Sequence, residues 1–169
     1  MNNQAEAYLK NHENTNMEDF RTPPYLFKWI DQEYGPIEYD GACTDGLNNL
    51  APSLRLEDEW PKGTTVYSNP PYDMISLKSW FEKGLSHVEN GGVHIMLVPN
   101  KICQVGFVES INDYIQEIVF LGGRIDFISP YSVKGGTSRN GCFLLVNSKE
   151  RLLKLRSIKL KDIKKEMVV

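Results

Sequence analysis

Apolar residues recur at helical spacing in three stretches of the chain. The first stretch begins at Pro23, with Thr22 as the expected helix cap and proline in the first turn, and it ends before Pro36. The second stretch is residues 76–88, and the third, more weakly patterned, is residues 104–114. We therefore predict three helices with one apolar face each.

Short apolar runs between and after these stretches predict strands. The central runs are apolar at nearly every position, which is typical of strands buried on both faces of a parallel sheet. The predicted strands are residues 37–40, 65–68, 93–98, 117–121, 124–128 and 142–146. Strands and helices alternate over the first hundred residues, so the pattern predicts an α/β domain with a mostly parallel sheet. The closely spaced last strands, with a Gly-Gly turn at 122–123, predict an antiparallel edge.

The two ends of the chain differ in composition from this central region. Residues 1–18 are polar and rich in asparagine, and we expect them to form a loosely docked arm. Residues 19–148 are expected to form the folded domain. Residues 149–169 form a tail in which lysine and arginine alternate with leucine and isoleucine. This tail is either a basic element on nucleic acid or a docked helix or edge segment with a solvated face, and we favour the second.

The overall composition is that of a globular protein, with 41% hydrophobic and 24% charged residues. A formal net charge of -3 argues against a uniformly basic surface but permits local basic patches for phosphate contacts. No apolar run has the length of a membrane span. The three cysteines are widely spaced and odd in number, which indicates neither a zinc knuckle nor a disulfide framework. We expect free thiols in a reducing cytoplasm, no metal and no membrane.

Polar residues and prolines stand at the ends of three predicted strands. Asp40 ends the first strand, Asn69 follows the second, and a Pro-Asn pair at 99–100 follows the third. Ligands of open α/β sheets bind beyond the carboxyl ends of the strands. The sequence therefore predicts a cleft at this edge.

The sequence Asn69-Pro70-Pro71-Tyr72 can hold a planar amino group for chemistry. The amine of an aromatic base is a poor nucleophile, because its lone pair is delocalised into the ring. Two acceptors aimed at its N–H groups, the Asn69 side-chain oxygen and the Pro70 carbonyl, would expose that lone pair. The prolines make this wall rigid, and the Tyr72 ring can stack on the base.

This tetrapeptide resembles the catalytic motif of S-adenosylmethionine-dependent amino methyltransferases. The order of further features resembles the phage-type, Dam-like DNA N-6-adenine methyltransferases over about residues 19–147. These features are Thr22-Pro23, Asp40-Gly41-Ala42-Cys43, Asn48, Trp60, the run leading to Tyr72, Leu97-Val98-Pro99 and residues 123–127. The resemblance implies the class I methyltransferase fold, a Rossmann-like, doubly wound, mostly parallel sheet.

The resemblance also implies a site for the methyl donor. Thr22 and Pro23 would lie near the methionine carboxylate of S-adenosylmethionine, and Asp40 would accept from its ammonium group. Ala42 and Asn48 would lie along the same cofactor. For the cofactor ribose, a carboxylate among Glu57, Asp58 and Glu59 is one interpretation, and an acidic surface loop explains them equally well.

An adenine inside a duplex cannot enter such a pocket, so the base would be extruded or the substrate single-stranded. The expected phosphate contacts are Lys101, Arg124, Lys134 and Arg139. Phe127 can lie near the base, although a core aromatic is the simpler interpretation.

We therefore predict methyl transfer from S-adenosylmethionine to the exocyclic amine of adenine in DNA, with S-adenosylhomocysteine as product. The same tetrapeptide serves methyltransferases of RNA adenine or of protein glutamine, and a non-catalytic nucleic-acid-binding module could retain the fold. If a phage or prophage encodes the chain, its expected location is the cytoplasm of the bacterial host.

Overall fold

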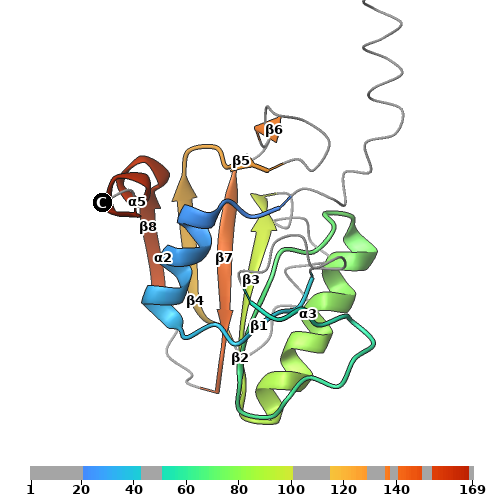
Figure 1. Ribbon diagram of the computed structural model, residues 1–169. Coiled ribbons are helices and arrows are strands. Elements are labelled where there is room, and N and C mark those ends of the chain that lie inside the picture. The colour runs from blue at the N-terminus through green and yellow to red at the C-terminus, as the bar shows by residue number, and fades with distance from the viewer. Residues whose placement is uncertain are drawn as a thin grey trace, which may run out of the picture.

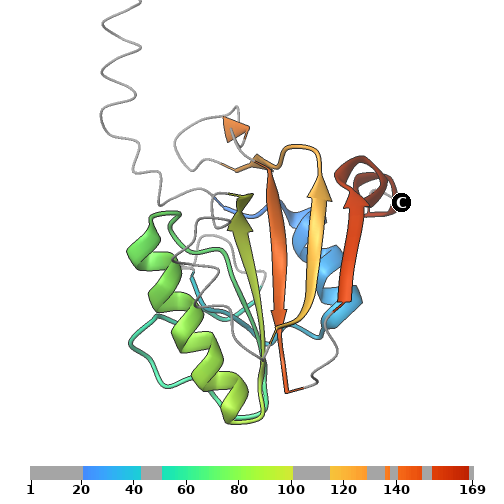
Figure 2. The same cartoon turned by 180° about the vertical axis from the view of Figure 1, so that it is seen from behind.

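The computed structural model describes residues 21–42, 51–100, 115–128, 136–137, 141–149 and 154–167. The predicted arm at 1–18 and the predicted helix at 104–114 lie outside these ranges. Within them, a six-stranded sheet carries helices on both faces (Figures 1 and 2). In this described part of the chain, no helix combines the length and the apolarity that crossing a bilayer requires.

The sheet is parallel except for one strand. Its order is β1 (Tyr39–Asp40), β2 (Thr65–Ser68), β3 (Val93–Pro99), β7 (Cys142–Asn147), β4 (Ile115–Gly122) and β8 (Lys154–Lys159). Only β7 runs antiparallel to its neighbours, and it lies inside the sheet between β3 and β4. The other strands therefore end at one common edge, the upper one in Figure 1.

The two strands predicted on either side of the 122–123 turn do not pair with each other. β4 pairs with β7 and β8, whereas β5 (Asp126–Phe127) pairs with β6 (Gly136–Thr137) in a separate two-stranded sheet. The turn contains Gly123 at φ 125°, a conformation that favours glycine and redirects the chain away from β4. β7 is buried at every position and pairs along most of β4, so it is the better partner.

The tail forms part of the same sheet. β8 pairs in parallel with β4 and leads directly into α5 (Leu160–Met167), which packs against α2 (Pro24–Tyr34). Most β8 side chains are exposed, while Leu160 and Ile163 are buried. The docked edge segment that we favoured from the sequence is therefore confirmed, with a solvated basic face.

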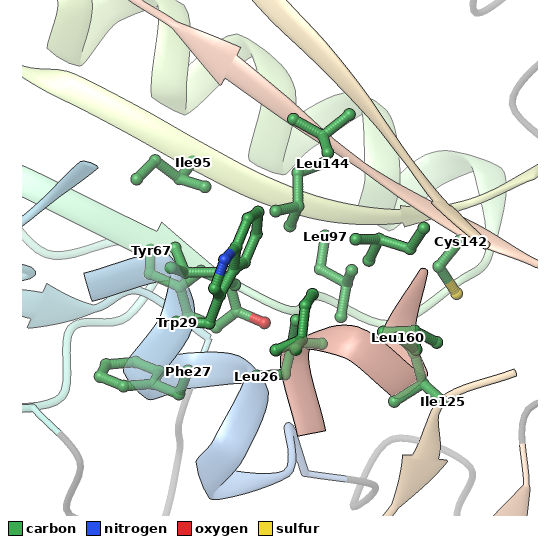
Figure 3. Close-up of a cluster of buried hydrophobic side chains, with 14 of the residues drawn as sticks. Leu26, Phe27, Trp29, Tyr67, Ile95, Leu97, Ile125, Cys142, Leu144 and Leu160 are labelled. Carbon is green, nitrogen blue, oxygen red and sulfur yellow. The ribbon is translucent and has the colours of Figure 1, made fainter. Parts of the chain in front are cut away.

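One face of the sheet is covered by α2 and α5. Apolar side chains of α2 pack onto the alternate strand positions that point to this face, and Figure 3 shows this cluster. Its members include Leu26, Phe27, Trp29, Tyr67, Ile95, Leu97, Ile125, Cys142, Leu144 and Leu160. The amphipathic pattern of residues 23–34 thus predicted the correct helix and the correct buried face.

The opposite face is covered by α3 (Met74–Glu89), whose N-cap is Asp73. The buried cluster on this face includes Trp60, Val66, Leu77, Trp80, Phe81, Met96 and Val98. His94 belongs to this core, since it is fully buried and its Nε2 lies 2.7 Å from Ser68 Oγ. Burial lowers the pKa of His94 to about 3, so its ring is neutral at physiological pH.

Candidate active site

Two neighbouring strand ends form the framework of the site. β1 and β2 are parallel and in register, with Asp40 opposite Tyr67. Immediately beyond, the Gly41 N–H donates to the Tyr67 carbonyl over 2.7 Å. Asp40 and the 69–72 segment therefore leave the sheet at neighbouring strand ends.

The Asp40 backbone is fixed on both sides. Its N–H donates to the Pro52 carbonyl over 2.9 Å, and its carbonyl accepts from the Leu54 N–H over 2.8 Å. The chain at 52–54 thus continues the sheet beyond β1. Because β1 has only two strand residues, these extra hydrogen bonds hold the carboxylate in place.

The carboxyl group of Asp40 is surrounded by protein although the residue as a whole is half-buried. Burial raises the pKa of Asp40 from 3.8 to about 6, against the lowering effects of the Ala42 N–H and of the Arg21 charge. The Ala42 N–H donates to Oδ1 over 3.2 Å. A buried carboxylate with a raised pKa is strongly stabilised by a cation placed against it.

Gly41 lies where the loop after β1 approaches the core closely. A Cβ at this position would lie 3.0 Å from Trp60 Cζ2 and 3.1 Å from Val66 Cγ1. The Trp60 indole is itself held by an Nε1–H donated to the Arg55 carbonyl over 3.0 Å. A side chain at 41 would therefore crowd the Trp60 and Val66 side chains.

The 69–72 segment is organised by its own tyrosine. The Tyr72 hydroxyl donates to Asn69 Oδ1 over 2.9 Å, and burial raises the pKa of Tyr72 well above its usual value, which keeps the phenol a donor. An amide oxygen accepts two hydrogen bonds, so this contact is compatible with a second N–H donor on Asn69. Pro70 is buried and Pro71 half-buried, which makes the segment rigid.

Two further side chains contact the Tyr72 ring or hydroxyl. The Phe127 ring is edge-on to Tyr72, with centroids 6.3 Å apart, and Cys142 Sγ lies 4.0 Å from the hydroxyl. Tyr72 also packs against the buried clusters of both sheet faces. The position of this tyrosine is therefore set by β5 and β7 as well as by its neighbours in sequence.

Thr22 does not cap α2, which corrects the sequence-based expectation. The N-cap position is Pro23, and no side-chain oxygen caps the helix. The Thr22 hydroxyl is buried and lies 2.7 Å from the Tyr67 hydroxyl, so it is committed to the sheet instead of the helix end. This contact ties the segment before α2 to the strand that carries the 69–72 segment.

The structure brings together only part of the predicted set. Asp40, Ala42 and the 69–72 segment lie at adjacent strand ends, and Thr22 with Pro23 joins them through Tyr67. Arg124 is exposed and follows β4 at the same edge of the sheet. Asn48, Lys101, Lys134 and Arg139 lie outside the described residues, so their roles stay predictions.

Two of the three ribose candidates, Glu57 and Asp58, contact Arg55 of their own loop. Asp58 accepts from the Arg55 N–H over 2.7 Å, and Glu57 lies 3.9 Å from the Arg55 guanidinium. These contacts fit the acidic surface loop that the sequence left open. Within the described ranges, no group of three or more His, Cys, Asp or Glu side chains is placed to hold a metal ion.

Sequence reasoning missed three residues of this region. Tyr67 anchors Thr22, Arg21 lowers the pKa of Asp40 by its charge, and Cys142 contacts Tyr72. Tyr67 was detectable in principle, because a tyrosine hydroxyl inside an apolar strand needs a buried partner. Cys142 left no signal, since seventy residues separate it from Tyr72.

Comparison with known proteins adds a family and a fold. Residues 10–168 match the family model described as DNA N-6-adenine-methyltransferase (Dam). A Listeria monocytogenes structure described as a class I S-adenosylmethionine-dependent methyltransferase is similar with a TM-score of 0.53 and 12% identity, covering 98% of this chain and 75% of that one. An Agrobacterium tumefaciens structure described as an O-methyltransferase has a TM-score of 0.35 and 14% identity, over 62% and 52% of the two chains. The comparison with curated proteins gave no match.

Proposed function

The chain belongs to the DNA N-6-adenine-methyltransferase (Dam) family, and we infer from this that the strand ends of β1 and β2 are its active site. It is an enzyme that transfers a methyl group from S-adenosylmethionine to the N6 amine of adenine in DNA. The single observation that carries the site assignment is the pairing of Asp40 with Tyr67 at adjacent parallel strand ends. It places a buried carboxylate beside the acceptor-rich 69–72 segment.

The donor side of the site fits the cofactor by its chemistry. S-adenosylmethionine supplies an activated methyl group and carries an ammonium group on its methionine end. The raised pKa of Asp40 marks a carboxylate that is costly to keep charged and that an ammonium group would stabilise. Thr22 and Pro23 would lie near the methionine carboxylate of S-adenosylmethionine. Ala42 and Asn48 would lie along the remainder of the cofactor.

The acceptor side prepares the amine. The Asn69 oxygen and the Pro70 carbonyl would each accept an N–H from the N6 amine, which draws the nitrogen toward tetrahedral geometry. The nitrogen then attacks the methyl carbon, a new N–C bond forms as the C–S bond breaks, and the extra proton leaves to solvent afterwards. No strong base is needed, and Tyr72 both orients Asn69 and offers its ring to the adenine.

The contacts to the DNA backbone and the cellular location are also proposals. Arg124 supports the first, because it is exposed at the edge where the β strands end. Lys101, Lys134 and Arg139 would add phosphate contacts. The buried thiol of Cys142 fits a reducing cytoplasm, that of the bacterial host if a phage or prophage encodes the chain.

The test is methyl incorporation into unmodified DNA, followed by identification of the methylated nucleoside. We expect N6-methyladenine from the wild type and a strong loss with Asn69→Ala. Digestion of DNA from expressing cells with methylation-sensitive nucleases then maps the target site. No incorporation by the wild type, or undiminished incorporation by Asn69→Ala, would contradict the proposal.

Two controls separate the other interpretations. Label that survives digestion with nucleases would indicate a protein acceptor, and label removed only by ribonuclease would indicate RNA. Calorimetry with S-adenosylmethionine tests the non-catalytic alternative, for which neither heat nor a thermal shift is expected.

A further inference from the structure

Two exposed apolar side chains follow the 69–72 segment closely in the sequence. Among the described residues, the large hydrophobic side chains with substantial exposure are Met74, Ile75, Phe120, Ile128 and Leu155. Met74 and Ile75 follow Tyr72 by two and three positions, and Ile128 follows Phe127, the aromatic that contacts Tyr72. Of these five side chains, Met74 and Ile75 lie within three positions of Tyr72 along the chain.

Packing does not account for Ile75. The buried face of α3 is formed by Leu77, Trp80, Phe81, Gly84 and Val88, and it points into the sheet. Ile75 lies on the opposite side, 81% exposed, at the head of a stripe that continues with Lys78 and Glu82. The stripe is polar after its first residue, so its one apolar member lies at the end nearest the active site.

The N-terminal end of α3 lies at the edge of the sheet that carries the candidate active site. α3 begins at the edge where β3 and β4 end (Figure 1), and Asp73 caps it by accepting from the Ser76 N–H over 2.9 Å. The cap carboxylate is thereby engaged with the helix. Met74 and Ile75 project from the first turn beyond it, 39% and 81% exposed.

We propose that Met74 and Ile75 form an apolar wedge that enters the base stack of duplex DNA when the target adenine is extruded. The inference rests on the proposed methylation of adenine in DNA. Extrusion leaves a gap in the stack and removes stacking energy, and apolar side chains inserted at a base step compensate for that loss. The wedge and Tyr72 are at most three residues apart, so a base leaving the gap reaches the pocket directly.

The size and charge of the wedge favour DNA over a protein partner. Two side chains at one helix end are far below the roughly 800 Å² per partner of a standard protein interface. Neither side chain is charged, which suits a base step and not a phosphate. Lys78, in the next turn, is 60% exposed with only a 3.7 Å contact to Glu82, so it can meet the backbone beside the gap.

The experiment compares two forms of the target site found by the digestion mapping. One is the normal duplex, and the other carries an abasic position opposite the target adenine, where extrusion costs less. Ile75→Ser and the double change with Met74→Ser are tested. Leu155→Ser, on exposed β8, is the matched control because Leu155 is 67% exposed and away from the strand ends.

The expected result is a methylation rate on the normal duplex that falls roughly tenfold or more with Ile75→Ser, and further with the double change. On the abasic duplex the loss should be under about twofold, since little extrusion remains to be driven. Leu155→Ser should change neither rate, and donor affinity and thermal stability should stay as in the wild type.

Three other outcomes would contradict the proposal that Met74 and Ile75 form a wedge. Equal losses on both duplexes would place Ile75 in the chemistry or the fold, and unchanged rates on both would remove it from DNA recognition. A loss that disappears at high enzyme concentration would indicate contact between two copies of the chain. A wild type that methylates neither duplex would instead refute the proposed function, so the two failures are distinguishable.

Discussion

The ends of β1 and β2 are neighbours, yet they carry opposite kinds of polar group. β1 ends in a carboxylate whose pKa is raised to about 6 by burial, and β2 leads into a neutral wall of amide and carbonyl acceptors. The Gly41 N–H to Tyr67 carbonyl bond joins the two ends. One end suits a cation that must be bound, and the other suits an uncharged amine that must react.

This difference separates two tasks that a single pocket must perform. At the amine, neutral acceptors are sufficient, because they bind its N–H groups and expose the nitrogen lone pair. A neutral partner at the ammonium group of the donor would leave a buried charge poorly compensated. Substitutions at each strand end should therefore change different kinetic quantities.

The largest effect is expected at the neutral end. Asn69→Ala removes an acceptor from the amine, and we expect the methylation rate at saturating donor to fall roughly 100-fold or more. Asn69→Asp keeps an acceptor and should lose less of the methylation rate than Asn69→Ala. Single-turnover rates measure both, and donor affinity by calorimetry should stay unchanged. A larger loss for Asp than for Ala would show that this end requires something other than an acceptor.

The next effect is expected at the charged end. Asp40→Asn keeps the shape but removes the charge, and donor affinity should fall by about 10- to 100-fold, because a charge-assisted bond becomes a neutral one. The rate at saturating donor should change little. Isothermal titration with S-adenosylmethionine measures the first quantity, and a variant with normal affinity but a slow rate would reverse the assignment of the two ends.

Acidity should weaken donor binding through the same carboxylate. Asp40 is protonated as the pH falls through about 6, so the Kd for the donor should rise there, by up to about tenfold per pH unit below that value. Asp40→Asn should give a flat profile over the same range. A wild-type profile without this inflection would contradict the role of Asp40.

Asp40 gives folding stability a pH dependence opposite in sign to the one it gives donor binding. The folded pKa of Asp40 is raised, so the folded protein binds more protons than the unfolded chain between pH 3.8 and about 6. The contribution of this group to stability is full below pH 3.8 and is lost as the pH rises through about 6. Bound donor should offset that loss.

The smallest effect is expected where the segment before α2 meets β2. Tyr67→Phe leaves the buried Thr22 hydroxyl without its 2.7 Å partner, and we expect about 1 to 3 kcal/mol of lost stability in urea unfolding. Adding Thr22→Val removes both polar groups and should cost less than the sum of the single changes. Additive losses would show that the two hydroxyls are not coupled.

Much of this site could be predicted because its central part is contiguous. The four residues of the 69–72 segment and the apolar run before them carry their chemistry in local order, and Asp40 is recognisable from its place after a strand. Partners distant in sequence could not be predicted. Thr22 has the sequence environment of a helix cap, and only the proximity of Tyr67, 45 residues away, gives it a different role.

The sequence by itself determined the helices α2 and α3 and most of the strands, and it predicted the reacting groups, because these depend on side-chain periodicity and on local composition. The tertiary structure decided that β7 lies between β3 and β4, that β5 pairs with β6, and that Asp40 is buried. Strand order follows from which long-range pairings bury the most apolar surface, and a raised pKa follows from all the groups that exclude water around a carboxylate. Neither quantity is a property of a short stretch of chain.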